Sequence, residues 1–168
     1  MNYTVGIFLL LLTQTAIADE PMAMPMSYVK CSKSGGFCVK VKLNSNIQAY
    51  KNTGSKIHKD ILWEVPGWHR NIFLSNNGVT LVIVYDGQSL IPLKYKQQMV
   101  MIKIWKSGVL KYTIRLDSLI DNFSSLERTV SHYQWGDFSG FDKNENFVVS
   151  TVENRRLLIN INTGIVSE

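Results

Sequence analysis

The fold follows from one stretch, residues 76–84, which reads Asn76-Asn77-Gly78-Val79-Thr80-Leu81-Val82-Ile83-Val84. Asn and Gly are residues that tight turns favour. The six residues after them are mostly β-branched and apolar, which is typical of a β-strand. Segments of this kind recur along the chain, and the sequence therefore predicts an all-β protein.

Short stretches in which apolar and polar residues alternate, separated by turn residues, mark the predicted strands. These strands cover residues 27–31, 37–43, 47–51, 57–65, 71–75, 79–85, 99–106, 109–116, 131–136, 147–152 and 156–161. One short helix is predicted within Asp117–Thr129, where Asp117 is a suitable N-cap and Leu119, Ile120, Phe123 and Leu126 form an apolar patch. We expect this segment to cover an open end of the β core or to dock a partner.

The strands form three similar units. Each unit has a polar or glycine turn, an apolar strand, a connector and a second strand that ends in Gly. Gly36 to Gly54 is 18 positions, Asn146 to Gly164 is also 18, and Gly78 to Gly108 is 30. An insertion around residues 86–98, which contains Gly87 and Pro92, accounts for the longer middle unit and is predicted to be a loop.

These units resemble the inner strands of β-propeller blades, on the evidence of the Asn76-Asn77-Gly78 turn and the later turns Lys106-Ser107-Gly108 and Asn162-Thr163-Gly164. The resemblance covers most of residues 19–168 and implies an antiparallel meander of about three propeller-like repeats. Propellers usually have four to eight blades. Three units therefore imply a partial propeller, a sandwich or barrel, or a ring that closes through an oligomer.

The first eighteen residues have the features of a secretory signal peptide. The apolar run from Val5 to Leu12 has the length of an h-region, and Ala16-Ile17-Ala18 forms an A-x-A cleavage site before Asp19. The segment before the apolar run has no Lys or Arg, so an uncleaved anchor is the alternative. We expect a signal peptide at 1–18, a single all-β domain at 19–168, and a periplasmic or secreted protein.

Cys31 and Cys38 are the only cysteines, and Gly35-Gly36 lies between them. In an exported protein, such a pair indicates a disulfide. We expect it to close a hairpin.

The net charge of +5 is a mild basic bias. The Lys and Arg residues are spread along the chain, whereas nucleic-acid binders concentrate them on one face, so no nucleic-acid partner is expected. No second apolar run of membrane-spanning length follows the signal segment, and a soluble product without a transmembrane segment is expected after cleavage.

Two clusters that combine aromatic residues with a His are candidates for ligand binding. The first contains Trp63, Trp68, His69 and Arg70, and the second contains His132, Tyr133 and Trp135. Aromatic walls with a few polar groups suit carbohydrate, aromatic or peptide ligands. The alternative is that these aromatic side chains fill the space between sheets.

No motif for a metal or a cofactor stands out, and none is expected. The histidines, His58, His69 and His132, lack the spacing of metal ligands. Ser131 and His132 are neighbours whose side chains would point to opposite faces of a strand, which makes them a poor nucleophile and base. If the protein is an enzyme, His132 with a carboxylate such as Asp137 is the candidate pair.

The stretches Trp63–Trp68 and Ser131–Gly136 are similar to small exported bacterial proteins of unassigned function, and this likeness implies a location and a fold. The sequence thus favours an exported β domain of the cell envelope with a non-catalytic binding or scaffolding role. Its expected partner is an envelope protein or a glycan, and exposed strand edges would allow a homo-oligomer. The alternative is an envelope hydrolase that acts on glycan or peptide.

Overall fold

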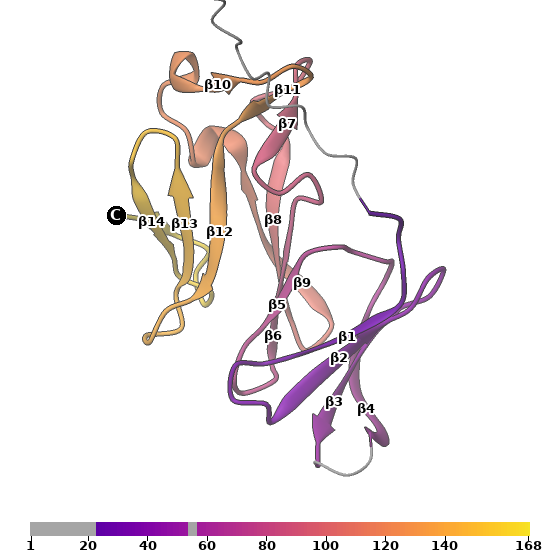
Figure 1. The fold of residues 1–168 in the computed structure, drawn as a ribbon. Coiled ribbons are helices and arrows are strands. Elements are labelled where there is room, and N and C mark those ends of the chain that lie inside the picture. The colour runs from indigo at the N-terminus through magenta and orange to yellow at the C-terminus, as the bar shows by residue number, and fades with distance from the viewer. Residues whose placement is uncertain (1–22, 54–56) are drawn as a thin grey trace, which may run out of the picture.

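The computed structural model describes residues 23–53 and 57–168, and the side chains of 57–59 lie outside that description. The predicted signal peptide and the side chain of His58 therefore fall outside it. The structure is nearly all β, with 49% of residues in strands and 4% in helices, and its four sheets are antiparallel (Figure 1). The predicted all-β class is confirmed.

Three of the sheets are four-stranded meanders whose strands pair in chain order, as in a propeller blade. The first sheet contains β1 (Tyr28–Cys31), β2 (Phe37–Val41), β3 (Ile47–Asn52) and β4 (Ile57–Val65). The middle sheet contains β5 (Ile72–Leu74), β6 (Thr80–Val84), β8 (Val100–Lys106) and β9 (Val109–Arg115). The last sheet contains β12 (Gly136–Phe141), β13 (Phe147–Thr151), β14 (Arg156–Ile159) and β15 (Val166–Ser167).

A fourth, small sheet joins β7 (Leu90–Pro92), β10 (Glu127–Arg128) and β11 (His132–Gln134). Strand β7 lies in the insertion of the middle unit, which was predicted to be a loop. It pairs with β11, with His132 opposite Pro92 and Tyr133 opposite Ile91. The insertion thus connects the middle of the chain to the segment that leads into the last sheet.

The three predicted units correspond to the second and third strands of the three meanders. The glycine that ends two of these units lies against the last strand of the preceding sheet. A Cβ at Gly108 would lie 2.7 Å from the backbone oxygen of Glu64 in β4. A Cβ at Gly164 would lie 2.8 Å from the ring of Tyr112 in β9. The repeated glycine therefore allows one sheet to approach the next.

The core consists of two apolar clusters that share the middle sheet. Leu81 and Ile83 of β6 pack with Val39 and Val41 of the first sheet. Val82 and Val84, on the other face of β6, pack in the cluster that contains Phe147 and Val149 of the last sheet, and all these β6 side chains are buried. The alternation of a β-strand thus lets the run 81–84 contribute to both clusters.

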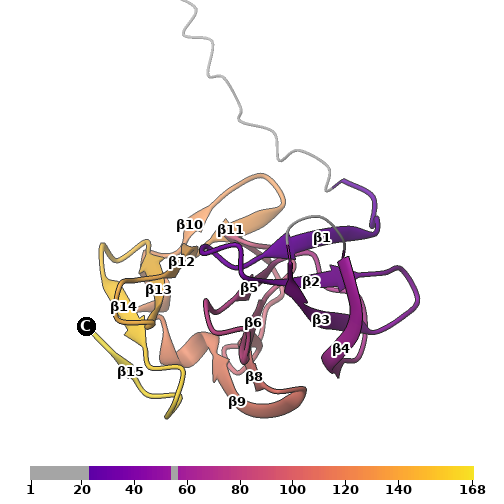
Figure 2. The same ribbon diagram turned by 90° about the horizontal axis from the view of Figure 1, so that it is seen from below.

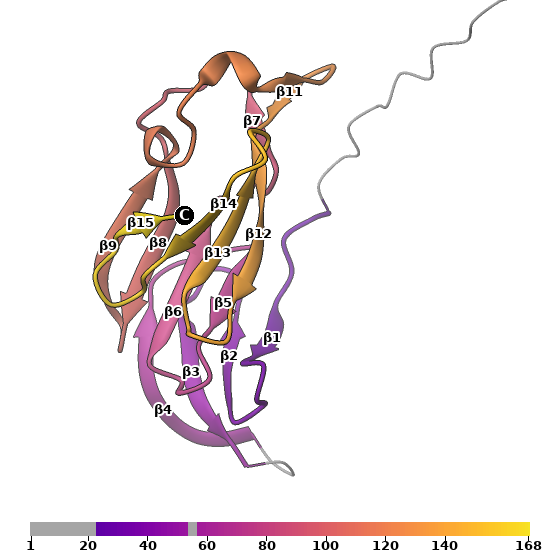
Figure 3. The same ribbon diagram turned by 90° about the vertical axis from the view of Figure 1, so that its left-hand side faces the viewer.

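Figure 2 shows the three large sheets spreading outward from their first strands, β1, β5 and β12. Figure 3 shows the same sheets side by side, with the small sheet at one end of the molecule. In the part of the chain that the structure describes, the sheets form no closed barrel. The result is an open stack in the order first, middle and last sheet.

The predicted disulfide is present between Cys31 and Cys38. These residues lie directly opposite each other in β1 and β2, and the next pair, Ser32 and Phe37, is joined by a backbone hydrogen bond of 2.8 Å. The bridge therefore closes the hairpin around Gly35-Gly36, as expected. A disulfide also suggests an oxidising compartment outside the cytoplasm.

The segment Asp117–Thr129 differs from the predicted helix. In place of a helix it has two 3₁₀ turns, Leu116–Ser118 at its start and Phe123–Ser125 within it, followed by the short strand β10. The chain between them is held by Glu153, whose carboxylate accepts hydrogen bonds from the backbone N–H groups of Asp121 and Asn122 at 3.1 and 2.7 Å. Leu119, Ile120 and Leu126 are still buried in the core, so the segment does cover apolar side chains. Among the described residues, no helix has the length and apolar character needed to span a bilayer.

Candidate functional site

The segment Trp68-His69-Arg70 lies between β4 and β5, where the chain passes from the first sheet to the middle sheet. Tyr28 in β1 fixes this segment, because its hydroxyl donates to the backbone oxygens of His69 and Arg70 at 2.5 and 3.1 Å. The Arg70 guanidinium lies 5.3 Å from the centre of the Trp68 ring, and the indole N–H of Trp68 donates to the Met26 oxygen at 2.8 Å. Trp68 is half-buried, and its one polar group, the indole N–H, is used in this hydrogen bond within the fold.

His69 faces a small cavity of about 130 Å³ between the ends of β6 and β8. Burial lowers the pKa of His69, Asp86 opposes this shift, and Lys103 reinforces it. Asp86 accepts a hydrogen bond from the backbone N–H of Arg70 at 3.0 Å. The volume is well below that of ordinary ligand pockets, which begin at roughly 300 Å³, so this cavity suits water or a small ion.

Trp63 and Trp135 lie within the packed structure. Trp63 stands at the junction of the first and middle sheets, where its indole N–H donates to the Gly78 oxygen at 2.9 Å. Trp135 is fully buried, and its indole N–H donates to the Gln88 oxygen at 2.7 Å. Both side chains hold elements of the fold together, and Trp135 presents no surface to a ligand in this structure.

The two aromatic clusters contact the same loop. The backbone of Gln88 accepts the Trp135 hydrogen bond, while its side-chain amide donates to Asn71 Oδ1 at 3.0 Å, next to Arg70. His132, in contrast, belongs to the small sheet, and Tyr133 packs edge-on against Tyr95 with ring centres 5.8 Å apart. The loop therefore connects the clusters, but His69 and His132 belong to different parts of the fold.

The structure corrects one argument about the second cluster. Ser131 precedes β11 rather than lying within it, so the alternation of strand side chains does not separate it from His132. Its hydroxyl and His132 Nδ1 are 2.8 Å apart and form a hydrogen bond. Asp137 lies in β12, opposite Ser150, and its carboxylate accepts from the backbone N–H of Phe138 at 2.7 Å. His132 and Asp137 thus lie in different sheets.

A larger cavity, of about 350 Å³, lies where the first strands of all three large sheets meet. It is bounded by β1 and its turn, β5 and its turn, and β12 and its turn. Its walls combine charged, polar and aromatic residues: Lys30, Cys31, Lys33, Phe73, Leu74, Asn76, Ser139, Gly140, Phe141 and Asp142. We call this space the central cavity. Figure 2 shows the three strands that border it, in the middle of the molecule.

Phe73 forms the apolar wall of the central cavity. Its ring packs edge-on against Phe147, with centres 5.0 Å apart, and the Lys30 ammonium lies 4.5 Å from its centre. Gly140, at φ +87°, makes room for the ring, because a Cβ there would lie 3.3 Å from it. A Cβ at this position would require the Phe73 ring to shift by a few tenths of an ångström.

The polar wall is held by hydrogen bonds within and between turns. Asn76 Oδ1 accepts from the backbone N–H of Ser34 at 2.8 Å, which joins the turns of the first and middle sheets. Asp142 Oδ1 accepts from the backbone N–H groups of Asn144 and Asn146 at 2.8 and 2.9 Å. Although desolvation opposes it, this hydrogen bonding lowers the pKa of Asp142. The Asp142 carboxylate therefore accepts hydrogen bonds from the backbone of its own turn.

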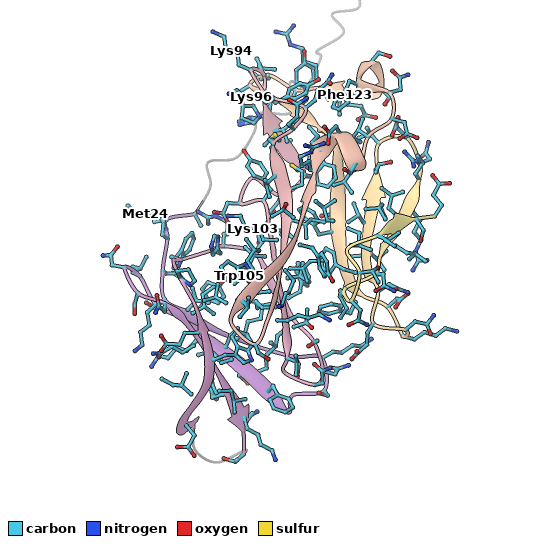
Figure 4. The ribbon with its side chains drawn as sticks, turned by 180° about the vertical axis from the view of Figure 1, so that it is seen from behind. Met24, Lys94, Lys96, Lys103, Trp105 and Phe123 are labelled. Carbon is cyan, nitrogen blue, oxygen red and sulfur yellow. A yellow bond between two sulfur atoms is a disulfide. The ribbon has the colours of Figure 1, made fainter. Side chains whose placement is uncertain are left out.

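Two further surface features flank these sites. A shallow hollow beside Trp68 is lined by Asn44, Ser45, Asn46 and Gly67. Lys94, Lys96 and Phe123 lie at the end of the molecule that carries the small sheet (Figure 4). Lys103 and Trp105 lie away from that end, near the junction of the first and middle sheets. Trp68, one of the predicted ligand-binding residues, thus borders the shallow hollow.

Within residues 23–53 and 57–168, no group of three or more His, Cys, Asp or Glu side chains could hold a metal ion. No protein-family model matches the chain, and no curated protein matches it. The candidate site therefore rests on the geometry of the chain itself. The sequence did not predict the central cavity, because its walls come from three strands that are far apart in the chain and meet only in the folded structure.

Proposed function

We propose that this chain is an exported, non-catalytic binding domain of the cell envelope, which acts in the periplasm or outside the cell. The A-x-A site at Ala16-Ile17-Ala18 and the Cys31–Cys38 bridge support the location. The observation that carries the binding role is the central cavity, which has the size of a small-ligand pocket and combines aromatic walls with a few polar groups.

The test is a search for ligands by NMR with the ¹⁵N-labelled, disulfide-bonded protein. The probes are amino acids, short peptides, neutral sugars and uronic acids, which represent the chemistry of an envelope. We expect shift changes for at least one class at residues 30–33, 73–76 and 139–142. Shift changes confined to other surfaces, or none with any probe, would overturn the central cavity as the binding site.

A cavity-filling variant makes this test specific. Ser139 is exposed and lines the cavity, so Ser139→Trp should abolish binding and leave the fold intact. Ser150 is also exposed, on β13 and outside the cavity, so Ser150→Trp is the matched control and should bind normally. Equal binding by both variants would argue against the site.

A second function, hydrolysis of glycan or peptide, is favoured by the hydrogen bond between Ser131 and His132. A serine nucleophile needs such a base. Hydrolysis of chromogenic esters, peptides and glycosides by the protein, lost in Ser131→Ala and His132→Ala, would support this function. Equal rates in the two variants and the unaltered protein would exclude it.

A further inference from the structure

We propose that the central cavity binds an anionic group, a carboxylate or a phosphate, carried on a small apolar or aromatic body. This inference rests on the proposed function and adds the chemical class of the ligand. Three observations carry it: the cationic groups in the walls, the hydrogen bonds that occupy the Asp142 carboxylate, and the aromatic surface beside the lysines.

The cationic groups come from the first sheet. Lys30 lies in β1 and Lys33 in the turn that follows it, and both border the cavity. The Lys30 ammonium faces the Phe73 ring at 4.5 Å, an arrangement that orients it over the apolar wall. Burial lowers the pKa of Lys30. The Lys30 residue as a whole is exposed, so its ammonium is open to an anion that enters the cavity and would form a charge-assisted hydrogen bond with it.

The one acidic residue of the walls does not neutralise these lysines by a direct ion pair among the described contacts. Asp142 uses Oδ1 for two backbone N–H groups, and its Oδ2 accepts from Asn146 Nδ2 at 3.3 Å. Asn76 likewise uses its oxygen for the Ser34 N–H, which leaves its amide group as a further donor. The groups that remain to contact a ligand are mostly donors, which suits an anion.

The rest of the wall is apolar and sets the size of the ligand. Phe73 and Phe141 come from different sheets, and both lie against Phe147, with ring centres 5.0 and 5.7 Å apart. The volume of about 350 Å³ accommodates a molecule with one ring. An aromatic ring between these side chains would gain edge or offset contacts.

The experiment uses benzoate, phenyl phosphate and neutral benzamide as probes, with dissociation constants measured by NMR titration of the disulfide-bonded protein. Benzoate and phenyl phosphate separate a carboxylate ligand from a phosphate ligand. We expect at least one of them to bind at least tenfold more tightly than benzamide, with shift changes at residues 30–33, 73–76 and 139–142. The preference should shrink at high salt, because charge interactions near a surface are screened.

Lys30→Gln should weaken binding of the preferred anion at least tenfold and leave the benzamide affinity unchanged. Lys111→Gln, at an exposed position of β9 and outside the cavity, is the control and should change neither. If benzamide binds as well as the anions, or if Lys30→Gln has no effect, the anionic ligand is wrong while the cavity remains a binding site. If neither these probes nor the wider ligand search perturbs the cavity, the proposed function itself fails.

Discussion

At the scale of single residues, Trp135 shows how an aromatic side chain can connect separate elements. It is the largest of the fully buried side chains and packs against Phe138, with ring centres 5.1 Å apart. Its indole N–H holds the backbone of Gln88, in the insertion of the middle unit. Both its volume and its hydrogen bond therefore contribute to stability.

Trp135→Ala should lower the free energy of unfolding by about 3–5 kcal/mol, because it leaves a large cavity in the core. Trp135→Phe should cost less, since it keeps a six-membered aromatic ring and leaves a smaller cavity, although it loses the indole hydrogen bond, and Trp68→Ala should cost the least. Urea unfolding followed by circular dichroism measures all three. A loss below about 1 kcal/mol for Trp135→Ala would contradict the buried position.

Tyr28 gives a prediction about pH. Burial, and secondarily Asp86, raise its pKa to about 12, while Arg70 opposes the shift. The neutral phenol is the form that donates to His69 and Arg70, so folding favours it. Its contribution to stability is complete below the ordinary tyrosine pKa of 10 and is lost as the pH rises through about 12.

Absorbance titration at 295 nm should therefore show one tyrosine that ionises near pH 12 and is missing in Tyr28→Phe. The variant should also show a smaller loss of stability between pH 10 and 12 than the unaltered protein. If the ionisation step that is missing in Tyr28→Phe lies near pH 10 instead, Tyr28 is an ordinary exposed tyrosine and the contact with the 68–70 segment is absent.

Residue patterns could predict part of the site and not the rest. The aromatic and His residues near positions 68 and 132 stand out by composition, and the structure does place them at sheet junctions. Lys30, Phe73 and Phe141 do not stand out, because each is an ordinary residue of an alternating strand. Their juxtaposition depends on the order in which three sheets stack, which no local pattern contains.

At the scale of elements, glycines set the spacing between sheets. Gly108 belongs to the two-residue turn between β8 and β9, in which Ser107 and Gly108 both have positive φ, of 46° and 80°. Such turns match the twist of a hairpin. Gly108 also lies against the backbone of β4. Gly108 is therefore required for two reasons: the turn needs a residue with positive φ, and the close approach of β4 leaves no room for a side chain.

Two glycine variants separate these requirements. Gly35 also has positive φ, at 74°, but it faces open space, so Gly35→Ala should cost about 1 kcal/mol for backbone strain alone. Gly108→Ala should cost about 1–3 kcal/mol more, because its Cβ would overlap the Glu64 oxygen. Thermal unfolding of both variants measures the difference. Equal losses would mean that the first and middle sheets are not in close contact there.

The predicted strands and the observed ones agree where side-chain alternation is strong, as in 37–43, and where an apolar run follows a clear turn, as in 79–85. The alternation signal fails at β12, which contains Gly136, Ser139 and Gly140 and a bulge after Phe138. Glycine and serine are weak strand formers, and this strand forms because β13 offers it a paired edge. The helix expected at 117–129 fails for a similar reason, since Glu153 and the core hold that segment in turns.

At the scale of the whole molecule, the middle sheet unites two cores. Each of its faces packs against a different neighbouring sheet, as the residues of β6 demonstrate. Loss of the middle sheet would expose both clusters together. The three large sheets should therefore unfold in a single transition.

Two substitutions in the middle sheet test this coupling. Leu81→Ala affects the cluster shared with the first sheet, and Ile104→Ala affects the cluster shared with the last sheet. Each should lower the free energy of unfolding by about 2–5 kcal/mol and keep one transition. Far-UV and near-UV circular dichroism should give the same midpoint in each variant. Two separate midpoints would show that the sheets unfold independently.

The pairing of β7 with β11 has a consequence for the order of folding. Each large meander is built from one stretch of chain, with β7 set aside in the middle unit, so it can form as soon as that stretch is available, beginning with the disulfide-bonded hairpin nearest the N-terminus. β7 is different, because residues 90–92 must wait for residues 132–134. As the chain is synthesised from its N-terminus, the first sheet can therefore form early, while the insertion stays unpaired until the segment before the last sheet has arrived.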